Sequence, residues 1–372
     1  MKIIRIVESR SFFLAVAFSI SLSFMLPAFA TTAVIVNPDG KVTELGTLGG
    51  DYSEPYGIND KGQVVGWSST ADGDRHAFIT GPNGVGMTDL GTLGGDYSIA
   101  YGVNAAGQVT GSAKAEDGDY YAFITGPNGV GMSALGTPGG NYVGQSINDA
   151  GQVAGVSGTT AEQSYRGFMT GPDGVGTTDL SIRAASGINN AGQVAGIVLP
   201  PQGYFGAVIT GPGGVGVTNL GTLGGANSIV YGINNAGQVV GHSSTEDGFS
   251  HAYITGPDGA GMTDLGTLGG EQSSAFGVND AGRVVGFAET GHVNGPRHAF
   301  VTGSDGAGMI DLNSFAKLSD EIYLSRANGI NNLGQVIAVT SPIPEPASYA
   351  LMLAGLGLIG FMSRCRKTVC GT

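Results

Sequence analysis

Two short motifs alternate along this chain with a spacing of about 45 residues, and this repeat constrains the fold more than any other feature. The first motif reads G-I-N-x-x-G-Q-V-V-G and the second reads H-A-F-I-T-G-P-x-G-x-G-M-T-D-L-G-T-L-G-G. Seven copies of the first motif start at Gly57, Gly102, Ser146, Gly187, Gly232, Gly277 and Gly329. Repeats of this length are typical of solenoids, propellers and arrays of small structural units.

The two ends of the repeated region are complementary. It begins with an isolated second motif at residues 33–48 and ends with an isolated first motif at residues 329–339. The seven copies of each motif therefore form seven whole units only if the two ends meet in space. A closed ring achieves this and leaves no strand edge unpaired, whereas an open solenoid exposes both edges.

One unit is expected to contain four short antiparallel strands. In the first complete unit these lie near residues 56–59, 63–68, 76–80 and 87–93, and they are separated by turns rich in Asn, Asp and Gly. Glycine makes up 68 of the 372 residues, which suits a fold with many tight turns. The sequence therefore predicts an all-β fold, a seven-bladed β-propeller closed by strands from both ends, with an irregular β-solenoid as the alternative.

The fourth and seventh units depart from the repeat. In the fourth, the L-G-T-L-G-G segment is replaced after Leu180 by Ser181-Ile182-Arg183, and the seventh carries an insertion at residues 313–326. Loops tolerate such changes at little cost, so degeneration is favoured over a specialised site.

Both ends of the chain carry segments with a different composition. Residues 1–30 are predicted to be a signal peptide, cleaved after the small residues Ala28 and Ala30. The repeat domain spans residues 31–340, and residues 341–346 form a linker with Pro344, Glu345 and Pro346. Residues 347–367 are predicted to be a transmembrane sorting helix with a basic tail that includes Arg364, Arg366 and Lys367.

The charge balance excludes one class of partner. Residues 31–341 hold 10 Lys and Arg against 27 Asp and Glu, a net charge near −17. Nucleic acids and anionic lipids bind cationic surfaces, so neither is an expected partner. The only two cysteines, Cys365 and Cys370, lie after the apolar segment, so no disulfide is expected in the repeat domain.

Two resemblances follow from these motifs. The Pro-Glu-Pro triplet, the apolar segment and the basic end resemble the PEP-CTERM sorting signal, and the repeats are similar to the HAF repeat of probable extracellular proteins. The first resemblance implies recognition by an exosortase in the inner membrane of a Gram-negative bacterium, processing near the motif and a link to biofilm and exopolysaccharide. It also implies a secreted or cell-surface protein that is only transiently anchored in the inner membrane.

Few residues suggest a chemical site. Acidic pairs recur in the same loop of three units and are candidates for a Ca²⁺ ion, although a solvated turn is favoured. These pairs are Asp72 and Asp74, Asp117 and Asp119, and Glu246 and Asp247. His76, His251 and His298 share one repeat position, so they should be spread around a ring in structural roles.

We therefore expect a non-enzymatic protein without cofactors that acts as a structural or ligand-binding component of the envelope or the biofilm matrix. Its expected partners are extracellular polysaccharide or a surface protein. The alternative is an extracellular polysaccharide hydrolase or lyase. Asp179, Arg183 and Tyr204 of the aberrant fourth unit are the first residues to test for that activity.

Overall fold

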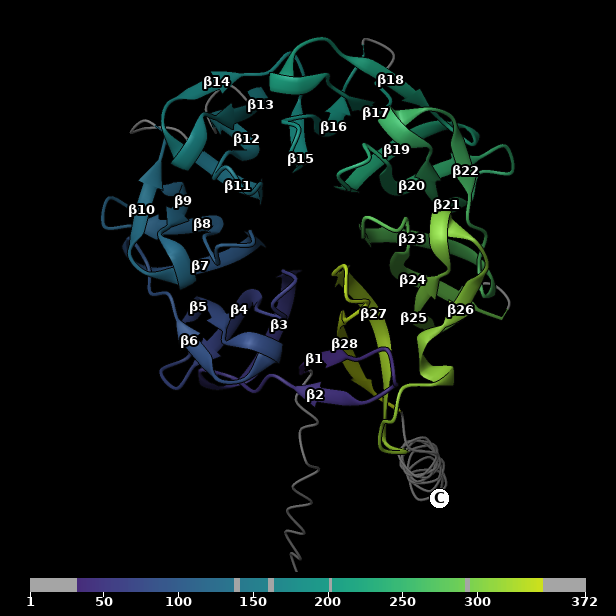
Figure 1. Ribbon diagram of the computed structural model, residues 1–372, viewed down its shortest axis with the longest axis horizontal. Coiled ribbons are helices and arrows are strands. Elements are labelled where there is room, and N and C mark those ends of the chain that lie inside the picture. Colours follow the sequence, from purple (N-terminus) through teal and green to yellow (C-terminus); the bar gives the residue numbers. More distant parts are fainter. Residues whose placement is uncertain (1–31, 137–140, 160–163, 201–202, 292–294, 344–372) are drawn as a thin grey trace, which may run out of the picture.

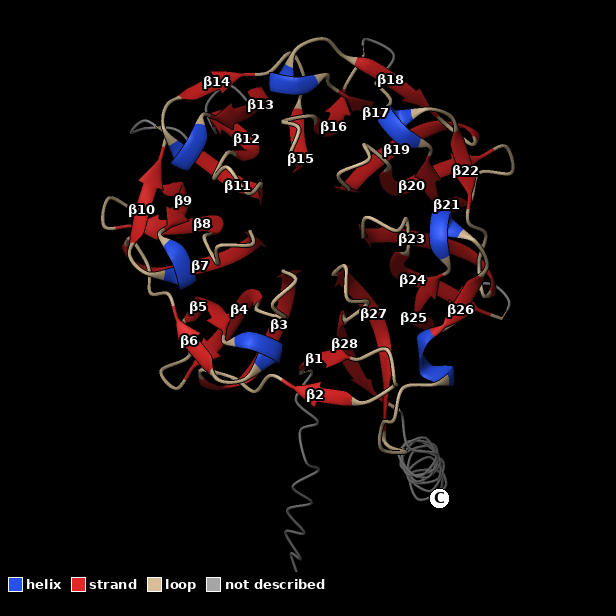
Figure 2. Ribbon diagram, in the orientation of Figure 1, coloured by secondary structure: helices blue, strands red, loops and turns tan. Residues whose placement is uncertain are grey.

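The computed structural model describes residues 32–136, 141–159, 164–200, 203–291 and 295–343. Throughout these ranges the chain alternates between β-strands and short 3₁₀ turns (Figure 2). The signal peptide at residues 1–30 and the sorting segment at residues 347–367 lie outside the described residues. Among the described residues, no helix is long and apolar enough to cross a membrane.

The strands form antiparallel groups of four, arranged around a central axis (Figure 1). The first two groups in chain order are β3 (Gly49–Ile58), β4 (Val64–Thr70), β5 (Arg75–Thr80) and β6 (Met87–Asp89), then β7 (Gly94–Val103), β8 (Val109–Ala115), β9 (Tyr120–Thr125) and β10 (Met132–Leu135). The next two are β11 (Asn141–Ile147), β12 (Val153–Thr159), β13 (Ser164–Thr170) and β14 (Thr177–Asp179), then β15 (Ala184–Ile188), β16 (Val194–Val198), β17 (Gly206–Ile209) and β18 (Thr218–Gly221).

Two further groups follow the same order. They are β19 (Gly224–Ile233), β20 (Val239–Thr245), β21 (Ser250–Thr255) and β22 (Met262–Asp264), then β23 (Gly269–Val278), β24 (Val284–Thr290), β25 (Arg297–Thr302) and β26 (Met309–Asp311). One parallel bridge, Arg75 to Tyr97, joins the groups β3–β6 and β7–β10 into a single hydrogen-bonded sheet. The all-β, propeller-like architecture predicted from the repeat is confirmed.

The last sheet combines both ends of the described chain. Its order is β2-β1-β28-β27, where β1 (Ala33–Val36) and β2 (Val42–Glu44) come from the N-terminal side and β27 (Ile322–Ile330) and β28 (Val336–Pro342) from the C-terminal side. β1 pairs with β28 in antiparallel register, Ile35 opposite Ile337. The two isolated motifs of the sequence therefore complete one sheet, as their complementarity predicts.

The 3₁₀ turns occupy a fixed place in the repeat. Six of them lie between the third and fourth strands of a group, and η7 (Leu312–Ser314) starts the insertion before β27. The six are η1 (Pro82–Gly84), η2 (Pro127–Gly129), η3 (Pro172–Gly174), η4 (Pro212–Gly214), η5 (Pro257–Gly259) and η6 (Ser304–Gly306). Five hold Asn or Asp with a positive φ of 52–56° at the central position, a conformation that these side chains tolerate better than most.

The core lies between neighbouring sheets. One cluster joins Val65 and Ile79 of the first complete group to Ala100, Val109 and Phe123 of the second, and the other clusters join neighbouring sheets in the same way. The Phe of the H-A-F triplet is fully buried in these clusters. Because the core continues from sheet to sheet, each sheet depends on both its neighbours.

One glycine of the repeat shows how closely the strands pack. A Cβ atom at Gly111 would lie 1.9 Å from the carbonyl oxygen of Ile99 and 2.7 Å from the ring of Phe123. No side chain fits at this distance, so the final Gly of G-Q-V-V-G is required by packing.

Two details of the sequence prediction need correction. The fourth strand of the first unit ends at Asp89 instead of Leu93, and the innermost strand begins at Gly49 instead of near Tyr56. The L-G-T-L-G-G segment connects sheets: Thr92 Oγ1 donates to the Gly95 carbonyl at 2.7 Å and also accepts from the Gly94 N–H at 3.2 Å. Side-chain hydrogen bonds thus support this connection in addition to the bridge from Leu93 to Ala115.

Candidate functional site

A ring of asparagines surrounds one end of the central channel. The Asn of each first motif is buried, and its Nδ2 donates to the carbonyl oxygen of the equivalent Asn in the next sheet, at 2.9–3.2 Å. We call this the asparagine ring: Asn59, Asn104, Asn148, Asn189, Asn234, Asn279 and Asn331. The last bond, from Asn331 to the carbonyl of Asn59, closes the circle at 3.0 Å.

Each member of the asparagine ring also shapes its own turn. Asn59 Oδ1 accepts from the N–H groups of Lys61 and Gln63 at 3.1 and 3.0 Å, while its Nδ2 also donates to Gln63 Oε1 at 2.9 Å. One side chain therefore fixes the turn within its sheet and the contact with the next sheet. Both roles need an amide with its two donors and its acceptor, which explains why every copy of the motif holds Asn.

Polar residues continue this end of the channel outward. The residue after each ring asparagine is exposed, and most of these accept an N–H bond from the preceding sheet, as Asp149 Oδ1 does from Ala105 at 2.9 Å. Three of them are carboxylates, Asp60, Asp149 and Asp280, and each also accepts from an Asn side chain at 2.7–3.1 Å. The cavity at this end has a volume of about 260 Å³.

A second cavity lies on the axis at another level of the channel. Its volume is about 260 Å³, and its wall includes one residue from every group of four strands. We call these seven residues the bulge ring: Tyr56, Tyr101, Gln145, Ser186, Tyr231, Phe276 and Asn328. Arg326 completes the lining.

The bulge ring is produced by a repeated backbone irregularity. Every innermost strand has a β-bulge three residues before its ring asparagine, so the register passes from Pro55 to Gly57 without Tyr56 and from Val230 to Gly232 without Tyr231. The same shift occurs in the other five innermost strands. A bulge reorients its side chain and commonly occurs beside functional sites, and here it aims seven side chains at one cavity.

Around the bulge ring, two pairs of aromatic residues alternate with polar residues. Tyr56 and Tyr101 have ring centroids 5.2 Å apart, and Tyr231 and Phe276 form an edge-to-face pair at 5.0 Å. Gln145, Ser186 and Asn328 supply amide and hydroxyl groups to the same wall. Such a wall offers apolar faces for stacking together with hydrogen-bond partners for hydroxyl groups.

Burial perturbs the tyrosines of this wall. Burial, followed by the electrostatic influence of neighbouring Tyr97, raises the pKa of Tyr101 to about 12. Burial and then the Glu54 carboxylate raise the pKa of Tyr56, although a hydrogen bond with Trp67 opposes the rise. Both hydroxyls are therefore neutral at physiological pH and available as hydrogen-bond donors and acceptors.

An ion pair lies beside the bulge ring at the junction of the closing sheet and the first complete group. Arg326 Nη2 donates to Glu54 Oε1, and the hydroxyl of Tyr52 donates to Glu54 Oε2 at 3.3 Å. The Glu54 side chain is only 12% exposed, whereas that of Arg326 is 37% exposed. The pair therefore lies partly inside the protein with the guanidinium toward the cavity.

The candidates for Ca²⁺ lie away from the channel, in the loops between the second and third strands. Asp117 accepts from the N–H of Asp119 at 3.0 Å and from the hydroxyl of Tyr121 at 2.9 Å, and Asp74 donates its N–H to Thr70 Oγ1 at 3.1 Å. The remaining candidates, Asp72, Glu246 and Asp247, are exposed. The described residues contain no group of three or more His, Cys, Asp or Glu that could hold a metal ion.

The repeated histidines form structural pairs. Nδ1 of His76, His251 and His298 lies 2.7–2.8 Å from a carboxylate oxygen of Asp89, Asp264 and Asp311 respectively. Each pair ties a third strand to a fourth strand of the same group. These contacts agree with the structural role expected for the three histidines.

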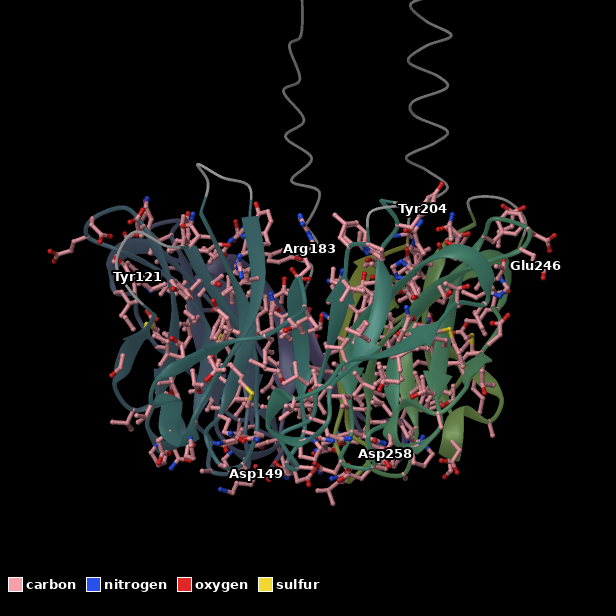
Figure 3. All side chains as sticks on the ribbon, turned by 90° about the horizontal axis from the view of Figure 1, so that it is seen from above. Tyr121, Asp149, Arg183, Tyr204, Glu246 and Asp258 are labelled. Carbon is pink, nitrogen blue, oxygen red and sulfur yellow. The ribbon has the colours of Figure 1, made fainter. Side chains whose placement is uncertain are left out.

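The three residues nominated from the fourth unit do not line either axial cavity. Arg183 lies over the ring of Tyr165, 5.3 Å from its centroid, Tyr204 is 54% exposed, and Asp179 is exposed on the edge strand β14. Tyr204 and Glu246 lie on the face opposite to that of Asp149 and Asp258 (Figure 3).

A larger groove lies beside the insertion of the seventh unit. It has a volume of about 630 Å³ and is lined by Pro296, His298, Asn313, Ala316, Leu318, Ser319, Asp320, Ile322, Tyr323 and Ile343. It adjoins the end of the described chain at Ile343. The groove does not involve every group of strands, whereas each group contributes a side chain to the bulge ring. We therefore regard the bulge ring as the stronger candidate for ligand binding.

Sequence analysis missed the bulge ring and the Glu54–Arg326 pair. The available signal was variation inside a constant motif: three residues before the invariant Asn, the chain holds Tyr, Gln, Ser, Phe or Asn. Since the same fold forms with each of these residues, the fold does not determine which residue occupies this position.

Comparison with known families identifies one segment of the chain. Residues 342–367 match the PEP-CTERM protein-sorting motif, which confirms the resemblance seen at the C-terminal end. The motif indicates a protein that is exported toward the cell surface of a Gram-negative bacterium and processed by an exosortase. No curated protein matches the chain.

Solved structures share the fold at low sequence identity. A puromycin hydrolase S511A mutant complexed with PGG aligns with a TM-score of 0.51 and 13% identity, over 78% of this chain and 50% of its own. A puromycin-hydrolyzing peptidase from Mycobacterium tuberculosis aligns with a TM-score of 0.50 and 14% identity, over 73% and 48%. TolB from Acinetobacter baumannii aligns with a TM-score of 0.48 and 8% identity, over 76% of this chain, and this chain spans only 64% of that TolB. At these identities the first two alignments show a likeness of fold alone.

Proposed function

We propose that this protein is a seven-bladed propeller of the HAF-repeat type that is exported, released at the cell surface and binds extracellular polysaccharide of the biofilm matrix without enzymatic activity. Each group of four strands is one blade in this proposal, and β1 paired with β28 closes the ring. The observation that carries the proposal is the bulge ring, which places four aromatic rings and three polar side chains around one cavity.

A sugar suits this cavity better than other ligands do. Tyrosine and phenylalanine faces stack on the C–H faces of sugar rings, and amide and hydroxyl groups satisfy the sugar hydroxyls. The volume of about 260 Å³ lies just below the range of about 300–1,000 Å³ for drug-sized ligands, so one sugar unit or a chain end is the expected occupant. The acidic domain lacks the cationic surface that nucleic acids need.

The composition of the cavity supports binding over catalysis. Hydrolysis of a glycoside generally needs two carboxyl groups on opposite sides of the bond. The described residues that line the bulge-ring cavity include no Asp or Glu, and Glu54 beside it is paired with Arg326. A hydrolase or lyase remains the alternative, and release of reducing sugar from matrix polysaccharide would favour it.

Retention of matrix polysaccharide by the immobilised protein tests the proposal. We expect the wild type to retain at least one matrix fraction, and Tyr231→Ala to weaken the apparent affinity about tenfold, since one stacking face is lost. Tyr165→Ala is the matched control, because Tyr165 is 49% exposed and lies outside the cavity. Absence of retention by the wild type, or equal loss in both variants, would contradict glycan binding at the bulge ring.

A further inference from the structure

We propose that Arg326 makes the channel selective for sugars that carry a carboxylate group, namely uronic acids. The proposal rests on glycan binding at the bulge ring and adds the chemical class of the ligand. Arg326 is the only cationic side chain among the described residues that line the cavity. Its guanidinium carbon lies 5.9 Å from the ring centroid of Phe276, a member of the bulge ring.

Only one other copy of the repeat has a charged residue at the position that Arg326 occupies. It lies five residues before a ring asparagine, and the equivalent position holds Glu54 in the neighbouring sheet. In the other five groups of four strands the residues are Ile99, Val143, Ala184, Ile229 and Ser274. Since five groups form with an uncharged residue here, the fold does not require a charge, and the pair needs another explanation.

Stability does not provide that explanation. Desolvation of two charges offsets much of their attraction, so a partly buried ion pair is weak evidence for stabilisation. The Nε of Arg326 is also the only buried side-chain nitrogen or oxygen in the described residues without a hydrogen-bond partner in the protein. A buried donor left in this way lowers stability and is typical of functional sites.

The geometry assigns different tasks to the two partners. Glu54 does not line the cavity and is held by Tyr52 and Arg326, so its carboxylate anchors the guanidinium from behind. Arginine has five N–H donors, and its hydrogen bond to Glu54 uses one of them. Because the guanidinium stays charged and planar, it can donate to a ligand carboxylate while it remains paired with Glu54.

The charge of the whole domain confines the binding of an acidic sugar to this site. With a net charge near −17, the domain repels polyanions from most of its surface. An acidic sugar therefore gains affinity only where a cation faces the ligand. The aromatic faces of the bulge ring serve neutral and acidic sugars alike, so the preference for a carboxylate depends on Arg326.

The proposal is tested by calorimetric titration of the purified protein. The ligands are oligosaccharides of glucuronic acid and glucose oligomers of the same length and linkage. A charge-assisted bond at a site shielded from water favours the acidic oligomer about ten- to hundredfold in the wild type. Arg326→Gln should remove this preference, so that its affinities for the acidic and the neutral oligomer agree within about threefold. Arg326→Lys, which keeps the charge without the planar fork, should retain only part of it.

Arg297→Gln is the matched control. Arg297 also lies over an aromatic ring, 4.4 Å from the centroid of Phe287, and 3.8 Å from Glu289, but it does not line the cavity. It should keep the full preference. The fluorescence of Trp67, the only tryptophan, provides a second readout, because Trp67 forms a hydrogen bond with Tyr56 of the bulge ring.

The outcomes separate the two proposals. Equal affinity of the wild type for both oligomers, or a preference that persists in Arg326→Gln, overturns the selectivity and leaves glycan binding intact. Failure of the wild type to bind either oligomer or any matrix glycan overturns both. If Arg326→Gln does not fold, the wild-type comparison and Arg326→Lys still decide the question.

Discussion

Asn189 shows how much one side chain of the repeat contributes to the fold. It is buried, donates to Gln193 Oε1 at 2.7 Å and to the Asn234 carbonyl at 3.2 Å, and accepts from two backbone N–H groups. Replacement by Ala leaves several buried groups without partners, so Asn189→Ala should lower the free energy of unfolding by about 3 kcal/mol. Denaturant unfolding followed by circular dichroism measures this loss.

The neighbouring residue supplies the control. Asn190 is exposed, and its hydrogen bonds compete with water, so Asn190→Ala should cost less than about 1 kcal/mol. Equal losses in the two variants would show that the asparagine ring adds nothing beyond an ordinary surface turn.

Tyr101 links the channel wall to the pH dependence of stability. Burial raises its pKa to about 12 from an ordinary value of 10, so between these values the folded state binds the proton more tightly than the unfolded state. This contribution is complete below pH 10 and is lost as the pH rises toward 12. The unfolding midpoint, measured as a function of pH, should therefore fall less steeply over this interval in Tyr101→Phe than in the wild type. Parallel curves would contradict the assignment.

At the scale of strands and turns, the sequence predicts what repeats and misses what varies. Four strands per unit could be predicted from the alternation of apolar residues and from the turns that contain Asn, Asp and Gly. Both signals are local properties of the chain. The sequence did not predict that the fourth strand ends at Asp89 or that the innermost strand begins at Gly49. Pairing with a neighbouring strand, rather than local propensity, decides where a strand begins and ends. The bulge at Tyr56 was not predicted, because a register shift is defined only once both strands are paired.

The strand β1 is the element on which closure depends. Ile35 is 1% exposed and packs with Val64, Phe78 and Ile337, which brings the N-terminal strand, the first complete group and the C-terminal strand into one cluster. Ile35→Ala should therefore lower the free energy of unfolding by about 2–5 kcal/mol in chemical denaturation. Val85→Ala, at a side chain 71% exposed, should change it by less than about 0.5 kcal/mol. A loss in Ile35→Ala as small as that control would mean that β1 is dispensable.

Across the whole molecule, counting the two motifs separately predicted that the ends meet, because a ring leaves no unpaired motif. The antiparallel pairing of β1 with β28 bears this out. The candidate site was less accessible to sequence reasoning, since Glu54 and Arg326 are far apart in the chain and become neighbours only when the ring closes. Their equivalence was visible in the repeat, but their contact required the fold.

The ends of the chain lead to the last prediction, which concerns its fate in the cell. Residues 342–367 match the sorting motif, and the last described strand, β28, ends at Pro342. Processing near the Pro344-Glu345-Pro346 triplet would therefore remove the apolar segment without breaking a described strand.

We expect the mature protein to lack the residues beyond about Pro346, and Glu345→Ala to leave the full C-terminal segment attached and the protein in the membrane fraction. Intact-mass measurement of protein recovered from the cell surface decides between the two forms. A mature mass that includes Arg364, Arg366 and Lys367 would show that the segment is retained as an anchor. The proposed binding of polysaccharide would then take place at the membrane instead of within the matrix.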